Sequence, residues 1–224
     1  MNLDDWRTIF ELSDRHGFVV ASDECYSEIY FKEGEPPLGA LDAARQLGRT
    51  DFKRLVMFSS LSKRSNVPGM RSGFVAGDAA VLERFALYRT YHGSAMSPMV
   101  QHASALAWGD EAHVAANRAL YREKFEQVTP MLAEVLDVAL PDAGFYLWLD
   151  VAHTRRDADG LAPAGIDTAW TRGLLAQQNI TSLPGEYLAR EGAGGSHPGR
   201  GRVRLSLVAP VADCLEAAHR IAAF

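Results

Sequence analysis

Short, continuous apolar runs that end in polar residues are the feature that most constrains the fold of this chain. The run at residues 18–21 is followed by Ser22-Asp23, the run at 55–58 by Ser59-Ser60, and a third run covers 73–77. Apolar runs of this length without alternation are typical of strands in a sheet that is covered on both faces. Helical patterns separate the runs, which predicts an α/β layer architecture.

The remaining sequence predicts more helices and, in its second half, an α+β module. The first helix is expected to begin at an acidic pair and to end at Gly17. Further helices are expected at residues 79–89, 98–108, 111–137, 167–178 and 212–223, and further strands at 145–151, 179–183 and 202–208. Pro130 should kink or divide the long helix that contains it. We therefore expect one domain over residues 1–128 and a second over 129–224.

Composition and charge exclude several classes of protein. The 224 residues are 47% hydrophobic and 23% charged, which is a globular composition in a chain long enough to bury a core. A net charge of −5 argues against nucleic acid or an anionic membrane as the main partner. No apolar run approaches the roughly 18 residues of a membrane span. Cys25, Cys214 and the histidines show no metal-ligand spacing, so we expect no metal site and a reducing, cytoplasmic compartment.

Lys63 is the first candidate for chemistry, because it follows the second apolar run and a short Ser-Ser-Leu-Ser segment. In open α/β sheets, ligands bind outside the carboxyl ends of the strands. A lysine that is held there can lose solvation and act as an amine nucleophile toward a carbonyl. Position alone leaves a second interpretation open, in which Lys63 is a solvated lysine on a loop.

The same segment also matches the S-x-x-K motif of penicillin-recognising enzymes, in which a lysine activates a serine. In this chain the two residues would be Ser60 and Lys63. Those enzymes also need S-D-N and K-T-G. Here Ser22-Asp23 is followed by Glu24 and lies upstream, and K-T-G does not occur, so the sequence disfavours this alternative.

Other polar residues fall close to the expected strand ends. Asp23 follows the first strand, and Tyr26 would face the same crevice if a helical turn starts there. A turn cap and a half-buried tyrosine are the ordinary alternatives. Arg71 follows a Pro-Gly turn that would return it toward Ser60 and Ser62. An arginine, two serines and nearby backbone N–H groups together indicate an anion cradle, whereas a lone arginine is usually in a surface ion pair.

Two arginines alternate along the last expected strand. A period of two puts Arg202 and Arg204 on one face, opposite Val203, Leu205 and Leu207. Without further context, this pattern predicts an exposed, charged face of the strand.

Taken together, these segments resemble the class I/II pyridoxal-phosphate-dependent aminotransferases, which have the aspartate aminotransferase fold. The resemblance is carried by residues 21–26, 59–74, 144–149 and 202–206, and it covers essentially the whole chain. It implies an α/β fold: the C-terminal portion of a fold-type I PLP-dependent transferase large domain, followed by an α+β small domain.

The resemblance also implies pyridoxal 5′-phosphate (PLP) as the cofactor and a role for each candidate residue. Lys63 would bond covalently to the cofactor and later move the proton at the substrate Cα. Asp23 would pair with the pyridinium nitrogen, and Tyr26 would hydrogen-bond the phenolate oxygen. Arg204, rather than Arg202, would bind the substrate α-carboxylate. The phosphate would be held by Ser60, Ser62 and Arg71.

Within the family, the likeness is greatest to the proteobacterial N-succinyldiaminopimelate aminotransferases of lysine biosynthesis, through residues 13–30, 88–93 and 198–204. The implied reaction moves an amino group between glutamate and N-succinyl-2-amino-6-ketopimelate. An aspartate- or alanine-type aminotransferase and a non-catalytic truncated fragment of such an enzyme remain open alternatives. The family also implies a homodimer, in which the loop at 92–94 would reach the partner subunit.

The chain departs from the family's pattern at its start. The family has an Asn-Pro-x-Gly segment just before a helix like the first one expected here, and no Asn-Pro-x-Gly occurs in this sequence. The resemblance therefore implies a chain that begins downstream of that segment, at an internal methionine or through a truncated gene model. Sheet edges would then be exposed. We expect the 224-residue chain alone to bind PLP weakly and to transaminate poorly.

Overall fold

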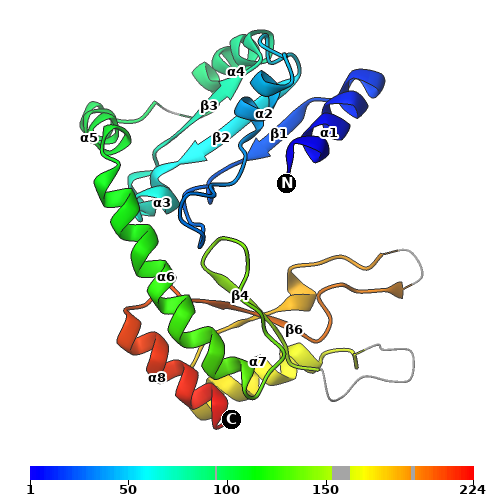
Figure 1. The fold of residues 1–224 in the computed structure, drawn as a ribbon, viewed down its shortest axis with the longest axis vertical. Helices are drawn as coiled ribbons and strands as arrows, with labels where there is room; N and C mark the ends of the chain where they lie inside the picture. The colour runs from blue at the N-terminus through cyan, green and yellow to red at the C-terminus, as the bar shows by residue number, and fades with distance from the viewer. Residues whose placement is uncertain (94, 153–161, 193–194) are drawn as a thin grey trace. The chain divides into compact units, whose positions relative to one another are not determined.

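The computed structural model describes residues 1–93, 95–152, 162–192 and 195–224 (Figure 1). The chain divides into two compact units, Met1–Arg118 and Ala119–Phe224. The division falls inside helix α6 (Ala112–Ala133). The predicted boundary at 128/129 lies in the same helix, and the interpretation of the units as a large and a small domain stays a prediction.

A three-stranded sheet forms the centre of the first unit (Figure 1). Its strands are β1 (Val20–Asp23), β2 (Leu55–Ser60) and β3 (Gly73–Gly77), in the order β1-β2-β3. β1 is parallel to β2, and Asp23 lies opposite Phe58. β3 is antiparallel to β2, and Gly73 lies opposite Ser60. The ends of β1 and β2 and the start of β3 therefore meet at one edge of the sheet.

Helices surround this sheet, and the first of them has well-formed ends. They are α1 (Leu3–His16), α2 (Ala40–Gln46), α3 (Leu61–Arg64), α4 (Ala79–Tyr91), α5 (Pro98–Gly109) and the start of α6. A capping box begins α1: the Asn2 side chain accepts hydrogen bonds from the N–H groups of Asp4 and Asp5, and Asp5 accepts one from the Asn2 N–H. Gly17 ends it with a left-handed φ of 75°, as the sequence predicts. The sequence pattern did not predict α2 and α3.

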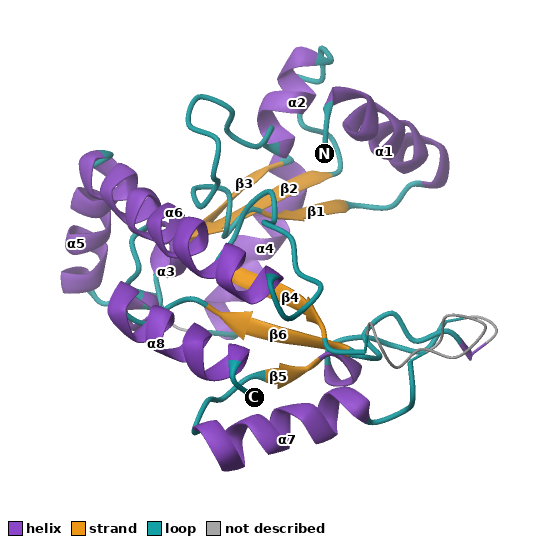
Figure 2. Cartoon of the chain, turned by 60° about the horizontal axis from the view of Figure 1, so that its bottom comes forward, coloured by secondary structure: helices purple, strands orange, loops and turns teal. Residues whose placement is uncertain are grey.

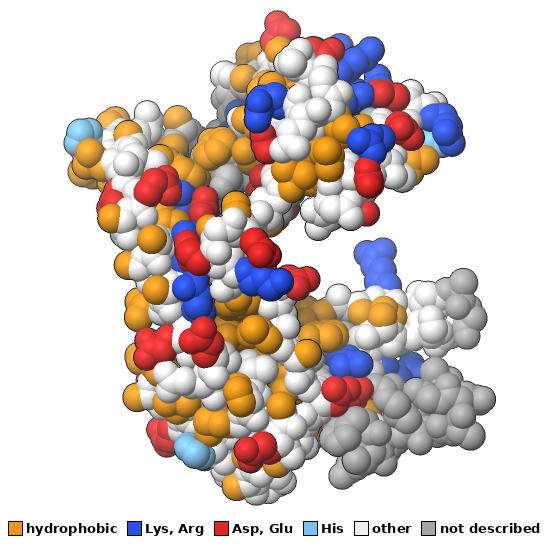
Figure 3. Space-filling view, in the orientation of Figure 1, with side chains coloured by type: hydrophobic (Ala, Val, Ile, Leu, Met, Phe, Trp, Pro, Cys, Tyr) orange, Lys and Arg blue, Asp and Glu red, His pale blue; other side chains and the backbone are white. Residues whose placement is uncertain are grey.

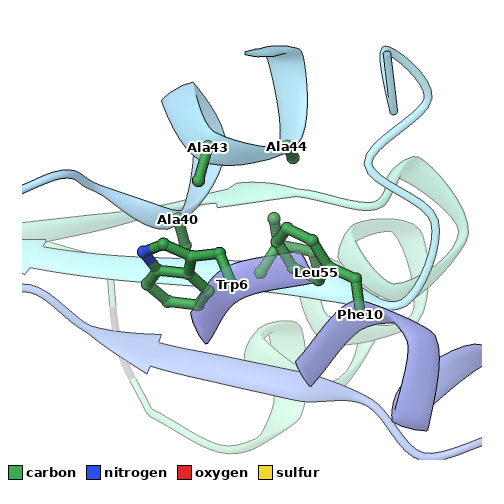
Figure 4. Packing of buried hydrophobic residues seen from close by; sticks show 6 residues of the cluster. All are labelled: Trp6, Phe10, Ala40, Ala43, Ala44 and Leu55. Atoms are coloured by element: carbon green, nitrogen blue, oxygen red, sulfur yellow. The ribbon is translucent and has the colours of Figure 1, made fainter. Parts of the chain in front are cut away.

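Two aromatic residues packed on alanines form a hydrophobic core cluster of the first unit (Figure 4). The rings of Trp6 and Phe10, both on α1, are stacked with centroids 5.6 Å apart, and the Trp6 indole N–H donates to the Leu38 carbonyl at 3.1 Å. The other buried members are Ala40, Ala43 and Ala44 of α2 and Leu55 of β2. Because alanine side chains are short, α2 approaches the rings closely, and the cluster holds both helices against the start of β2.

The expected burial of both sheet faces is wrong for the first unit. β1 begins at Val20, and the two residues before it, Phe18 and Val19, are 44% and 47% exposed. Pairing with β2 starts only where Val20 meets Leu55, so the earlier part of the apolar run has no neighbouring strand to pack with. Phe58 and Phe74 are also exposed. Continuous apolar runs therefore mark the strands of this sheet without reporting how deeply each is buried.

The second unit is an antiparallel sheet with helices beside it (Figure 2). Its strands are β4 (Tyr146–Asp150), β5 (Leu183–Pro184) and β6 (Arg202–Ser206), in the order β4-β6-β5. Its helices are the remainder of α6, α7 (Ile166–Gln178) and α8 (Val211–Ala222). Within β6, Val203 and Leu205 are buried and Arg202 and Arg204 are half-buried, so the predicted alternation is confirmed.

Three expectations for the second half need adjustment. α6 is not divided at Pro130; it runs through this residue and ends at Ala133. The strand expected at 179–183 is reduced to Leu183–Pro184, because Asn179 adopts a left-handed conformation to end α7. Among the described residues, no helix combines the length and the apolar character that crossing a membrane requires.

Candidate active site

An open cavity of about 860 Å³ lies in the first unit, at the sheet edge where β1 and β2 end. Five residues predicted from the sequence line this one cavity: Tyr26, Ser60, Ser62, Lys63 and Arg71. Aromatic side chains, among them Phe58 and Phe74, form part of the remaining lining. A mostly apolar hollow with a few convergent polar groups, in this size range, is the usual form of a small-molecule site.

Lys63 lines the cavity, whereas the side chain of its neighbour Arg64 has its contacts elsewhere. The Arg64 side chain is buried, its Nη1 donates to the Ala107 carbonyl at 2.9 Å, and it forms an ion pair with Glu111. Its guanidinium also lies 5.0 Å from the ring centroid of Trp108. Lys63 Nζ lies instead 5.7 Å from the ring centroid of Tyr26. The short helix α3 thus sends two consecutive cations in different directions, and only Lys63 lines the cavity.

The first turns of α6 hold α3 in place. The side-chain amide of Asn117 lies 3.3 Å from the Lys63 carbonyl and 3.4 Å from the Arg64 carbonyl, and it donates to both. His113 Nε2 lies 2.8 Å from the hydroxyl oxygen of Ser65. Sequence reasoning missed these supports, because His113 and Asn117 show no local motif and are far from α3 along the chain.

Asp23 acts on the cavity through Cys25. Its carboxylate accepts a hydrogen bond from the Cys25 backbone N–H at 3.1 Å, and Cys25 lines the cavity although Asp23 itself does not. Burial, followed by the hydrogen bond and negative charge of Asp23, raises the pKa of the Cys25 thiol from 9.0 to about 11, while the positive charge of Lys63 opposes the shift. Asp23 and Lys63 therefore act on the Cys25 thiol in opposite directions. The participation of Cys25 was not predicted.

Hydroxyl groups and a guanidinium gather at the start of β3. Ser60 Oγ lies 2.9 Å from Ser62 Oγ and 2.9 Å from the Ser72 carbonyl oxygen, and it accepts from the Ser62 N–H at 3.1 Å. Arg71 has a left-handed φ of 53°, and its Nη1 donates to the Pro68 carbonyl at 2.8 Å. Gly73 lies two residues after Arg71, and a Cβ at this position would lie 2.6 Å from the Ser59 carbonyl oxygen. The close approach of the β2 and β3 backbones at Gly73 keeps Arg71 near Ser60 and Ser62.

Arg204 lies on β6 of the second unit. Its guanidinium carbon lies 4.4 Å from the ring centroid of Tyr146 on the neighbouring strand. Arg202, on the same face, forms a 3.3 Å ion pair with the buried carboxylate of Asp150. The two arginines therefore differ: Arg202 neutralises a buried charge, whereas Arg204 rests on an aromatic face, which leaves its fork suited to a carboxylate.

The polar and aromatic groups in and beside the cavity define a class of site. An amine, a nearby carboxylate, paired hydroxyls, a guanidinium and aromatic rings suit a small aromatic molecule that carries a carbonyl and a phosphate. Within the described residues, no group of three or more histidine, cysteine or acidic side chains is arranged to hold a metal ion. The fold and site together thus define an α/β protein with a lysine amine at the edge of its sheet.

Comparison with known proteins identifies the family. The family model for aminotransferase class I and II matches residues 1–221. A solved aminotransferase from Neisseria meningitidis Z2491 is 57% identical, with a TM-score of 0.87 over 99% of this chain and 53% of that one. An LL-diaminopimelate aminotransferase from Aquifex aeolicus is 30% identical over 98% of this chain and 51% of its own length. A probable N-succinyldiaminopimelate aminotransferase from Thermus thermophilus, 24% identical with a TM-score of 0.76 over 100% of this chain and 54% of that one, shares the fold.

The chain belongs to the class I/II aminotransferases. The predicted family and fold class are therefore confirmed, and PLP is the cofactor of this family. The chain spans about half the length of the curated relatives it matches. The cavity fits the cofactor, because it offers an amine for an aldehyde and hydroxyl and guanidinium donors for a phosphate.

Asp23→Asn should lower the pKa of the Cys25 thiol, because it removes the carboxylate that holds the thiol proton. At about pH 8, below the present pKa, the thiolate fraction should rise and alkylation by iodoacetamide should accelerate by up to about tenfold. Mass spectrometry of the Cys25 peptide measures the rate in a Cys214→Ser background. Glu35→Gln, an exposed carboxylate on the following segment, is the matched control; equal rates in both variants would contradict the assigned contact.

Proposed function

We propose that the cavity binds PLP through the residues predicted from the sequence and that Lys63 is the catalytic residue of an amino-group transfer. The observation that carries the proposal is the position of Lys63: it shares one cavity with Tyr26 and with the donors of Ser60, Ser62 and Arg71. When bound, PLP supplies a ring that accepts electrons as the substrate Cα–H bond breaks.

The chain's own residues would divide the work of this reaction. The Lys63 amine takes and returns the proton at the substrate Cα. The Asp23 carboxylate favours a proton on the ring nitrogen, and the Tyr26 hydroxyl donates to the phenolic oxygen. Arg204 binds the substrate α-carboxylate through its planar fork. Each hydrogen bond to a charged group contributes about 1.5–3 kcal/mol. The phosphate is bound by Ser60, Ser62 and Arg71.

The proposed reaction is a step of lysine biosynthesis, within amino-acid metabolism. Glutamate is the amino donor and N-succinyl-2-amino-6-ketopimelate the acceptor. Relatives named LL-diaminopimelate aminotransferase, at 27–30% identity, support an acceptor with a diaminopimelate skeleton. The same relatives support a second candidate, in which the acceptor carries no succinyl group.

Reduction with borohydride in the presence of PLP should attach the cofactor permanently to the peptide that contains Lys63, because this is the amine that lines the cavity. Peptide mapping by mass spectrometry locates the label. Lys63→Arg should lose the label and any transaminase activity. Lys32→Arg, a matched change of an exposed lysine in the same unit, should keep both. Label that persists elsewhere in Lys63→Arg would refute the assignment.

The acceptor is tested by supplying glutamate with one 2-keto acid or aldehyde at a time and measuring 2-oxoglutarate formation. We expect kcat/KM to be highest with N-succinyl-2-amino-6-ketopimelate. The corresponding substrate without the succinyl group tests the second candidate, and oxaloacetate and pyruvate test an aspartate- or alanine-type enzyme. A higher kcat/KM with any of these would replace the proposed acceptor.

The proposal includes a homodimer, and α4 supports it. No side chain of this helix is buried, and Leu87, Tyr88 and Tyr91 are 63%, 59% and 78% exposed. An apolar surface of this kind is typical of an interface between chains. The loop at 92–94, expected to reach the partner, includes Ser94, which lies outside the described residues. Sedimentation equilibrium should show a dimer that Tyr91→Ser weakens; a monomer at all concentrations would contradict it.

A further inference from the structure

A second cavity in the first unit is lined only by ionisable side chains. It has a volume of about 440 Å³, and its lining residues are Asp14, Arg49, Asp51, Lys53 and Arg54. They come from the last turn of α1 and from the segment between α2 and β2. Over α1, charged side chains of both signs lie beside one another on the surface (Figure 3). Nothing in the proposed amino-group transfer uses these residues.

Two arginines of this cavity share one carboxylate. Arg49 Nη1 donates to Asp14 Oδ2 at 2.6 Å and its Nη2 to Asp14 Oδ1 at 3.2 Å, and Arg54 Nη2 also donates to Asp14 Oδ1. These bonds, with that of Arg49 first, lower the pKa of the Asp14 carboxyl. Both arginine side chains are half-buried, at 21% and 22% exposure. One carboxylate therefore balances two positive charges that the fold holds side by side.

A third cation leaves the cavity with an excess of positive charge. Lys53 is exposed, and its backbone N–H donates to Asp51 Oδ1 at 3.2 Å. Three cations and two carboxylates give the lining a formal charge of +1, although the whole chain carries −5. Among the described contacts, no protein atom accepts from Arg49 Nε or Arg54 Nη1. Guanidinium N–H groups thus remain for a ligand.

The backbone is strained on both sides of Lys53. Phe52 and Arg54 have left-handed φ values of 50° and 58°, which are unfavourable for side chains of this size. Arg54 is fixed there at both backbone groups: its N–H donates to Asp78 Oδ2 at 2.5 Å, and its carbonyl accepts from the Val20 N–H at 2.8 Å. Such strain persists where the surroundings over-determine it, and it concentrates at ligand sites.

We propose that this cavity binds a phosphate group, either as inorganic phosphate or as the phosphate of a small monoester. Arginine forks match phosphate oxygens, and the exposed lysine adds a mobile point charge. The site is separate from the Lys63 cavity, because the residues before β2 line one and the residues at its end line the other. The six residues of β2 span about 20 Å. The proposal therefore does not depend on the proposed function.

Binding of inorganic phosphate to the 224-residue chain is measured by phosphorus NMR titration at constant ionic strength. Lys53→Gln should weaken binding by about threefold, in line with one exposed charge contact. Lys32→Gln, which changes another exposed lysine outside the cavity, should leave it unchanged. Asp51→Asn should strengthen binding by about twofold, because it removes a negative charge and keeps the acceptor for the Lys53 N–H. A purely structural ion-pair cluster would not produce that gain.

The source of the phosphate is distinguished by repeating the titration with glycerol phosphate. A tighter complex than with inorganic phosphate, weakened equally by Lys53→Gln, assigns the site to a monoester; the reverse order assigns it to the free anion. Thermal unfolding of each variant checks that the fold is kept. No binding to the unaltered chain, equal binding to Lys53→Gln, or loss of binding only in Arg71→Gln would overturn the proposal, the last because it moves the phosphate to the Lys63 cavity.

Discussion

The parallel pairing of β1 with β2 is the constraint on which the first unit depends. Its register, from Val20 opposite Leu55 to Asp23 opposite Phe58, brings the ends of both strands to one edge of the sheet. A parallel connection needs a long crossover, and here it contains α2, whose alanines pack on the rings of α1. The core therefore secures the start of β2, while the candidate active site occupies its end. Packing at the start of β2 therefore helps to fix the position of the cavity residues at its end.

Two buried arginines also help to position the residues of the candidate active site. Arg64 is held by Glu111 and the Ala107 carbonyl, and this fixes the helical turn that carries Lys63. Arg118 is also buried: it pairs with Glu28 at 3.4 Å and Glu33 at 3.2 Å, and it fastens the segment that follows Tyr26. Removing the carboxylate partners would be costly, because each buried guanidinium would remain desolvated without a counter-charge. The two arginines therefore stabilise the segments around the cavity. The groups proposed to react are the less buried side chains that line it.

Local patterns in the sequence were sufficient to predict much of the cavity, and non-local contacts account for what they missed. The residues that lie near the ends of the first two apolar runs, or at the turn before the third, and that line one cavity are Tyr26, Ser60, Ser62, Lys63 and Arg71. α2 escaped prediction because Gly39 offers no capping side chain; instead Glu24, far back in the chain, accepts from the Ala40 N–H at 2.7 Å. The hydrogen bonds from Asn117 to the carbonyls of Lys63 and Arg64 were not predicted for the same reason. Contacts between residues far apart in the chain produce no recognisable pattern in the sequence, whereas the end of a strand is marked by the end of an apolar run.

The raised pKa of Cys25 has a consequence for chemical selectivity inside the cavity. The Cys25 thiol and the Lys63 amine are two nucleophiles that line this cavity. An electrophilic carbonyl bound there would be exposed to both. Sulfur attacks as the thiolate, and a pKa of about 11 leaves very little thiolate at neutral pH. Burial and, after it, the carboxylate of Asp23 keep the proton on sulfur, so the Cys25 thiol would compete only weakly for such a carbonyl.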